Sequence, residues 1–208
     1  MRFALAAGLS AASKAKRVDP SLEITVFERS GYISYGACGL PYFVGGLIGQ
    51  PDDLVSLNVD QMTHKRGIPT FIHHEVTRID RAARTVSVRD LDSGKNWEQP
   101  YDKLVIATGA RAIVPTLPGV DADGVYTLRT VEDGIRLKST VQSGPHRKAA
   151  VIGGGFIGLE MAENLHAQGA KVSIVEMGNQ VMAPIDFSMA SLVHQHLMDK
   201  GVNLYLEQ

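Results

Sequence analysis

The amino-acid sequence predicts an α/β protein in which two similar strand–helix–strand units flank a short antiparallel meander. The clearer unit covers residues 149–176, where an apolar strand, a glycine-rich loop, a helix and a second strand follow one another. A second copy of this pattern occupies residues 8–28. Between the copies, residues 75–79, 85–89 and 97–101 read as three short strands.

Composition narrows the class of protein. The 208-residue chain is 44% hydrophobic with a formal net charge of −1, as expected for a globular protein of one or two domains. Without a long basic or apolar run, neither a nucleic acid nor a membrane is an expected partner. Residues 1–12 could pass for a short signal peptide, but they continue into residues 13–17 as one helix. With one cysteine there is no internal disulfide, and we expect a cytoplasmic protein that acts on small molecules.

The glycine-rich loop of the second unit has the spacing of a dinucleotide-binding site. Gly153 permits a tight turn, Gly155 lets a pyrophosphate approach the backbone, and Gly158 allows close helix packing. Glu176 ends the next strand, where its carboxylate can accept hydrogen bonds from an adenine ribose. Residues 177–179 supply no cation for a ribose phosphate, which favours NADH over NADPH. The alternative, a glycine-rich turn with a chance acid, fits the complete order of elements less well.

The first unit lacks two glycines of this loop. When Gly8 is aligned with Gly158, the corresponding positions hold Phe3 and Leu5, and no strand precedes them. A helix and a strand follow, and that strand, predicted over 22–27, ends before an acid, as in the second unit. We therefore expect a truncated or wrongly started chain.

Two incomplete Rossmann-like dinucleotide-binding domains are predicted, one over residues 1–112 and one over residues 113–208. In the first, residues 104–107 read as a buried strand, and a proline and glycine cluster beyond it marks the crossing between domains. In the second, residues 188–200 read as an amphipathic helix and residues 202–206 as a strand. We expect the later strands of this domain to be missing from the chain.

Cys38 is the candidate reactive residue. Pro41 is expected in the first turn of the helix that follows, so the thiol is predicted at a helix N-terminus, which favours the thiolate. A single sulfur suffices for disulfide exchange if the partner is external. A buried structural cysteine is the alternative. The histidine pairs at 73–74 and at 194 and 196 lack helical i, i+4 spacing, and no metal site is expected.

The two units, the turn Ala107-Thr108-Gly109 and the run Ser34-Tyr35-Gly36-Ala37-Cys38-Gly39-Leu40-Pro41-Tyr42 resemble the pyridine nucleotide-disulfide oxidoreductases. Because it has a single cysteine, the sequence resembles the branch of this family that contains coenzyme A-disulfide reductases, NADH oxidases, NADH peroxidases and persulfide reductases. This resemblance implies FAD and NADH as cofactors, Cys38 as redox centre, and a full-length homodimer. It also implies that the C-terminal domain of a second subunit completes the active site.

The resemblance implies roles for further residues. In the first domain it implies FAD contacts at Gly8, Glu28, Val76, Ala107, Thr108 and Gly109, with another at Arg129. Glu160 matches an acid beside nicotinamide and flavin, although a solvated helix residue is an equal alternative. A coenzyme A site is implied at Ser10, Lys14, Arg17, Ser34 and Arg66. That match is partial, because Lys14 and Arg66 are substitutions and Ala37 replaces the usual asparagine.

Lys14, Lys16 and Arg17 also have a simpler explanation, since cations stabilise the C-terminal end of a helix.

Three functions are expected from the sequence. The first is an NADH-dependent flavoprotein that reduces a coenzyme A disulfide, a persulfide or a similar small disulfide. The second is an NADH oxidase or peroxidase of the same family. The third is an inactive nucleotide-binding fragment, for which weak catalysis at best is expected.

Overall fold

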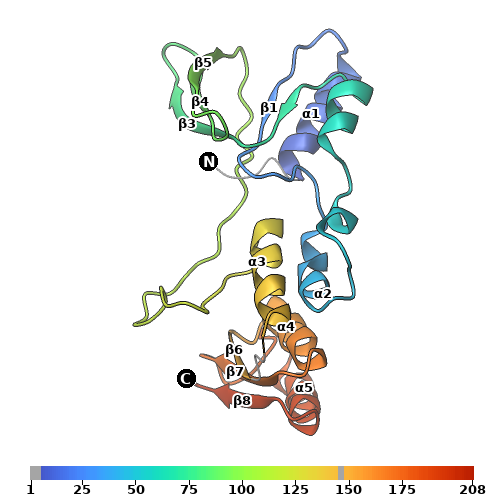
Figure 1. The fold of residues 1–208 in the computed structure, drawn as a ribbon, viewed down its shortest axis with the longest axis vertical. Helices are drawn as coiled ribbons and strands as arrows, with labels where there is room; N and C mark the ends of the chain where they lie inside the picture. The colour runs from blue at the N-terminus through green and yellow to red at the C-terminus, as the bar shows by residue number, and fades with distance from the viewer. Residues whose placement is uncertain (1–5, 145–147) are drawn as a thin grey trace. The chain divides into compact units, whose positions relative to one another are not determined.

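The computed structural model describes residues 6–144 and 148–208, which form two compact units (Figure 1). One unit runs up to Gly36 and includes Leu54–Pro118, and the other combines Ala37–Asp53 with Gly119–Gln208. The segment that contains Cys38 therefore groups with the second unit. The boundary predicted at residue 112 separates an FAD-binding domain from an NADH-binding domain, and this division stays a prediction.

A helix and two short parallel strands form the core of the first unit. Helix α1 (Ala7–Val18) packs beside β1 (Val26–Phe27), which pairs in parallel with β2 (Thr70–Phe71). The π-helical turn η3 (Gln61–Lys65) lies between these strands in sequence. The strand expected over 22–27 is thus confined to its last two residues, because β2 offers only two residues for pairing. The core consists of Leu9, Ala12, Val26, Ile33, Met62 and Ile68.

The antiparallel meander is confirmed. It contains β3 (His74–Asp80), β4 (Thr85–Asp90) and β5 (Asn96–Pro100), with β4 in the centre. Val86 and Val88 of β4 are buried, as the alternating pattern predicts. Residues 91–95 connect β4 to β5.

The prediction of a buried strand over residues 104–107 is wrong. These residues form no strand, and Val105 and Ile106 are 66% and 59% exposed. A buried parallel strand needs neighbouring strands to satisfy its backbone groups. In the described part of the chain, the parallel sheet of this unit contains only β1 and β2, and neither pairs with this segment.

The second unit has a parallel sheet with the order β6-β7-β8. Its strands are β6 (Lys148–Ile152), β7 (Lys171–Glu176) and β8 (Asn203–Leu206). Helix α4 (Phe156–Ala167) connects β6 to β7, and α5 (Phe187–Asp199) connects β7 to β8. The strand, helix and strand pattern predicted from the sequence is confirmed here. Both helices contribute side chains to one core cluster with Val172 and Ile174.

Two further helices pack against this core. Helix α3 (Val131–Gln142) begins with a capping box formed by Thr130 and Asp133. The short helix α2 (Leu40–Val44) contacts α3 and α4, and η2 (Pro51–Leu54) follows it. The Lys138 ammonium lies 4.1 Å from the centre of the Phe43 ring, which links α3 to α2.

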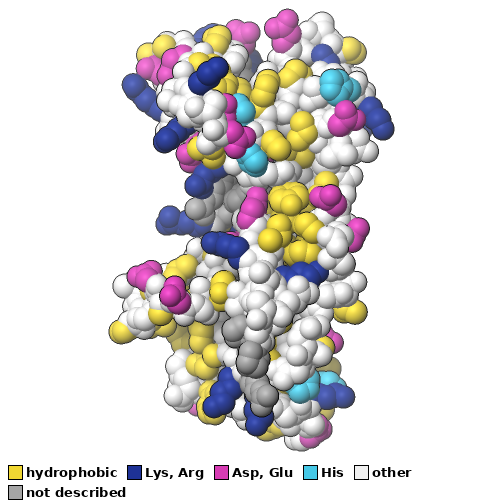
Figure 2. Space-filling model, in the orientation of Figure 1, with side chains coloured by type: hydrophobic (Ala, Val, Ile, Leu, Met, Phe, Trp, Pro, Cys, Tyr) yellow, Lys and Arg dark blue, Asp and Glu magenta, His cyan; other side chains and the backbone are white. Residues whose placement is uncertain are grey.

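Hydrophobic side chains also reach the surface, and several are visible in Figure 2. In the second unit, Ile152 on β6 and Tyr205 on β8 are 68% and 51% exposed. None of the described helices is long and apolar enough to cross a membrane.

Burial within the second sheet predicts a difference between two isoleucines. Ile174 is fully buried on β7, so Ile174→Ala should lower the free energy of unfolding by about 3 kcal/mol. Ile152→Ala on the neighbouring strand is the matched control and should cost less than about 1 kcal/mol. Urea unfolding followed by circular dichroism measures both, and equal losses would contradict the described core.

Candidate functional site

The loop between β6 and α4 has the backbone conformation of a tight turn. Gly153 adopts a φ of +103°, a region that side chains disfavour. Its N–H donates a hydrogen bond of 2.8 Å to the carbonyl of Val175, which fastens the loop to β7. Gly155 then starts α4 with extended backbone angles. The loop therefore presents the N-terminus of a 12-residue helix beside the end of the sheet.

Gly158 and Gly155 differ in the space that a side chain would find. A Cβ atom on Gly158 would lie 2.0 Å from the Gly153 carbonyl oxygen, so the helix can approach the strand only at a glycine. A Cβ on Gly155 would meet no atom within 4 Å, which leaves open space in front of the helix. This combination fits the predicted contact with a pyrophosphate.

Gly154 is a further constrained residue that the fingerprint spacing does not single out. A Cβ there would lie 2.8 Å from Cγ1 of Val181. Its N–H donates to Oε2 of Glu176 at 2.6 Å. The run of three consecutive glycines was the signal that could have identified it.

Glu176 is held by the backbone at the end of β7. Oε2 accepts from the Gly154 N–H, and Oε1 accepts from the Gly178 N–H at 2.7 Å. These two hydrogen bonds to the carboxylate lower the pKa of Glu176, with the Gly154 bond as the larger cause. Glu176 is therefore anchored as an ionised acceptor at the edge of the glycine loop.

Two other predicted cofactor residues lie in this unit. Glu160 is partly buried on α4, and its carbonyl oxygen accepts from the Asn164 side chain at 2.8 Å. Arg129 precedes α3, where its N–H donates to the Asp133 carboxylate at 3.1 Å. Their roles beside a flavin stay predictions.

The predicted FAD residues of the first unit differ in how firmly they are placed. Glu28 follows β1 and is 1% exposed, and its Oε1 accepts from both the N–H and the hydroxyl of Ser30 at 2.8 Å. Val76 lies on β3 where the register shifts, and Gly8 lies in the first turn of α1. The segment Ala107, Thr108 and Gly109 is irregular. Phe3 and Leu5, which replace the missing glycines, lie outside the described residues.

Cys38 is exposed in a single 3₁₀ turn, η1 (Ala37–Gly39). Helix α2 begins at the next residue after this turn, with Pro41 in its first turn. The predicted position before a helix is confirmed, and the alternative of a buried structural cysteine is wrong. An exposed thiol can reach an external disulfide.

The residues implied for a coenzyme A site are partly gathered in the first unit. Ser10, Lys14 and Arg17 are exposed and follow i, i+4 and i+7 spacing, so they share one face of α1. Arg66 is joined to the same helix by a hydrogen bond of 2.8 Å from its guanidinium to the Ser13 hydroxyl. Ser34 is half-buried in a loop.

Lys16 makes a structural contact just beyond helix α1. Its ammonium donates to the carbonyls of Pro20 and Leu22 at 2.8 and 2.7 Å, beyond the C-terminus of α1. This contact ties the helix end to the following chain, so Lys16 has a structural partner that Lys14 does not have among the described residues.

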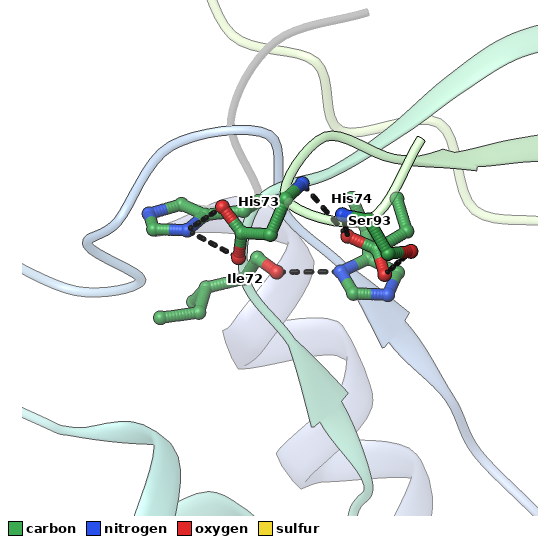
Figure 3. Close-up of polar contacts among 6 residues, drawn as sticks. Ile72, His73, His74 and Ser93 are labelled. Atoms are coloured by element: carbon green, nitrogen blue, oxygen red, sulfur yellow. Dashed lines mark hydrogen bonds and ion pairs between the residues drawn. The ribbon is translucent and has the colours of Figure 1, made fainter. Parts of the chain in front are cut away.

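The adjacent His73 and His74 bind different groups (Figure 3). Nδ1 of His73 lies 3.0 Å from the Asp92 carboxylate, whereas Nδ1 of His74 contacts the carbonyl of Ile72. Ser93 donates to the Asp90 carboxylate, which lowers the pKa of Asp90. Within residues 6–144 and 148–208, no group of three or more potential ligands could hold a metal ion.

A family comparison decides what kind of protein contains these features. The model of the pyridine nucleotide-disulphide oxidoreductases matches residues 5–208. The chain belongs to this family. Members of this oxidoreductase family use FAD and NAD(P)H, so the predicted cofactors are those of the family. The predicted α/β fold class, with dinucleotide-binding units and an antiparallel meander, is also that of the family.

Individual oxidoreductases agree with this assignment. The chain is 35% identical to an NADH oxidase from Methanocaldococcus jannaschii and 32% identical to a coenzyme A disulfide reductase from Staphylococcus haemolyticus. The alignments cover 98% and 99% of the chain but only 45% and 46% of these relatives. The chain thus spans less than half of their length.

A solved structure shows the same fold. The NAD-dependent persulfide reductase from A. fulgidus matches with a TM-score of 0.91 and 40% identity. The match covers 98% of this chain and 38% of that one. The likeness therefore extends over both compact units.

The hydrogen bonds of Glu176 predict a pH-dependent contribution to stability. Because its folded pKa is depressed, the contribution is complete above the ordinary value of 4.5 and is lost as the pH falls through the folded pKa. Replacement by Glu176→Gln should therefore cost about 1–2 kcal/mol at about pH 7 and much less at about pH 3. Urea unfolding of both proteins across this range measures the difference. A difference that does not change with pH would contradict the ionised anchor.

Proposed function

We propose that the protein is an NADH-dependent flavoprotein that passes electrons to Cys38 and from there to a coenzyme A disulfide, a persulfide or a similar small disulfide. The observation that carries this proposal is the glycine loop with Glu176 anchored at its edge. The exposed thiol of Cys38 and the family relatives support the disulfide chemistry. Residues 1–112 would bind FAD and residues 113–208 would bind NADH.

The loop residues bind and orient the dinucleotide in this proposal. The N-terminus of α4 faces the pyrophosphate, and the space in front of Gly155 admits it. The Glu176 carboxylate accepts hydrogen bonds from the adenine ribose diol and, as an anion, repels a phosphate on that ribose. FAD supplies electron transfer from NADH to the cysteine when it is bound.

At Cys38, the thiolate attacks one sulfur of the substrate disulfide. A bond forms between the cysteine sulfur and that sulfur, and the other half leaves as a thiolate, which gives a mixed disulfide. Two electrons from NADH then cleave the mixed disulfide, which releases the second thiol and restores Cys38. For coenzyme A disulfide, NADH and one proton yield NAD⁺ and two coenzyme A thiols.

The implied substrate residues on α1 fit a polyanionic partner. Lys14 and Arg17 project exposed cations from one helix face, and Arg66 is held beside it. Phosphate groups favour such cations. Ser10 and Ser34 add hydroxyl donors. We also propose a homodimer for the full-length protein, acting in the cytoplasm.

The second candidate is an NADH oxidase, favoured by the relative from Methanocaldococcus jannaschii. Here Cys38 would react with peroxide or oxygen-derived species to form a sulfenic acid. The third is a nucleotide-binding fragment, for which the 208-residue chain would bind NADH without turnover.

Anaerobic NADH oxidation by the FAD-supplemented chain distinguishes these functions. We expect NADH oxidation only when coenzyme A disulfide is present, and a loss of about a hundredfold or more in Cys38→Ser with NADH affinity retained. Turnover with oxygen or peroxide alone would instead support the oxidase. NADH binding without flavin binding or turnover would support the fragment.

The loop geometry predicts different effects on stability for two alanine substitutions. Gly155→Ala should fold with nearly unchanged stability, because its Cβ meets open space, but should weaken NADH binding about tenfold or more. Gly158→Ala should lower the melting temperature as well, because its Cβ collides with the Gly153 carbonyl. NADH fluorescence titration and thermal unfolding measure the pair. Unchanged NADH affinity in Gly155→Ala would contradict a pyrophosphate at this position.

A further inference from the structure

His194 accepts a hydrogen bond from a backbone N–H that lies outside its own helix, 13 residues earlier in the chain. It lies on α5 with 9% of its surface exposed, and its Nε2 accepts from the Val181 N–H at 3.1 Å. The Phe187 ring meets it edge-on, with 6.3 Å between ring centres. Because a backbone N–H can only donate, Nε2 of His194 carries no proton in this contact.

Val181 contacts both His194 and the glycine loop. Its side chain is fully buried, and its Cγ1 would lie 2.8 Å from a Cβ on Gly154. The next residue, Met182, donates its N–H to the Gly154 carbonyl at 2.9 Å. Met182 also adopts a φ of +52°, which costs free energy in a residue other than glycine. The hydrogen bonds donated by the Val181 and Met182 N–H groups hold the chain in this conformation.

Gly154 completes the connection to the predicted ribose acceptor. While its carbonyl accepts from Met182, its N–H donates to Oε2 of Glu176 at 2.6 Å. The carbonyl of Gly154 is thus bound to the segment that contacts His194, and the N–H of Gly154 is bound to Glu176.

From this chain of contacts we infer that His194 is a positioning residue for the dinucleotide site. It fixes Val181 and Met182 against Gly154, and thereby sets the loop and the Glu176 carboxylate in the geometry that receives NADH. The inference rests on the proposed binding of NADH at this loop.

Two substitutions separate the hydrogen bond from simple packing. His194→Leu fills the site without an acceptor, whereas His194→Gln restores an oxygen that can accept from the Val181 N–H. We expect NADH affinity, measured by fluorescence titration, to fall roughly five- to tenfold in His194→Leu and to return to within about twofold of wild type in His194→Gln. His196→Leu, at an exposed position two residues further along α5, is the control and should bind NADH like wild type.

Amide hydrogen exchange gives a second readout that does not require NADH. Exchange at Val181 and Met182 should accelerate in His194→Leu and remain slow in His194→Gln. Wild-type NADH affinity in His194→Leu, or equal weakening in the leucine and glutamine variants, would overturn the inference. If the wild-type chain does not bind NADH, the proposed function fails by itself, and unchanged exchange in His194→Leu would then overturn the positioning role separately.

Discussion

The close approach of helix α4 to the end of strand β6 is the constraint on which the candidate site depends. It occurs at Gly158, where a Cβ would lie 2.0 Å from the Gly153 carbonyl oxygen. Glycine at this position lets the helix begin directly beside the strand, with its N-terminal amides at the carboxyl edge of the sheet. The positive φ of Gly153 makes the necessary turn. The proposed binding and orientation of a dinucleotide depend on this packing.

A second layer of contacts joins the loop to neighbouring elements. Glu176 bonds to the loop through Gly154, and Val181 packs against the same glycine. The carboxylate thereby gains two backbone donors that keep it ionised, while the loop gains support from β7 and α5. In the proposed NADH site, the same groups that stabilise the loop also select the ribose, which connects stability with specificity.

Sequence predicts the second unit well because its signals are local. The glycine spacing, the helix that follows and the acid after β7 all lie within one stretch of 28 residues, 149–176. The strand predicted over 104–107 failed because a strand also depends on neighbours that its own residues do not encode. The contact between Val181 and His194 joins residues 13 positions apart through a folded loop, and no periodic pattern reveals it. The exposure of Cys38 likewise depends on packing rather than on its motif.

We propose that the glycine loop and Glu176 together form a site for NADH. The most direct measurement is a side-by-side titration of the purified chain with NADH and NADPH at the same ionic strength. We expect NADH to bind at least about tenfold more tightly than NADPH, because the ionised Glu176 accepts from a ribose diol and repels a ribose phosphate. Equal affinity for the two dinucleotides, or binding of neither, would contradict it.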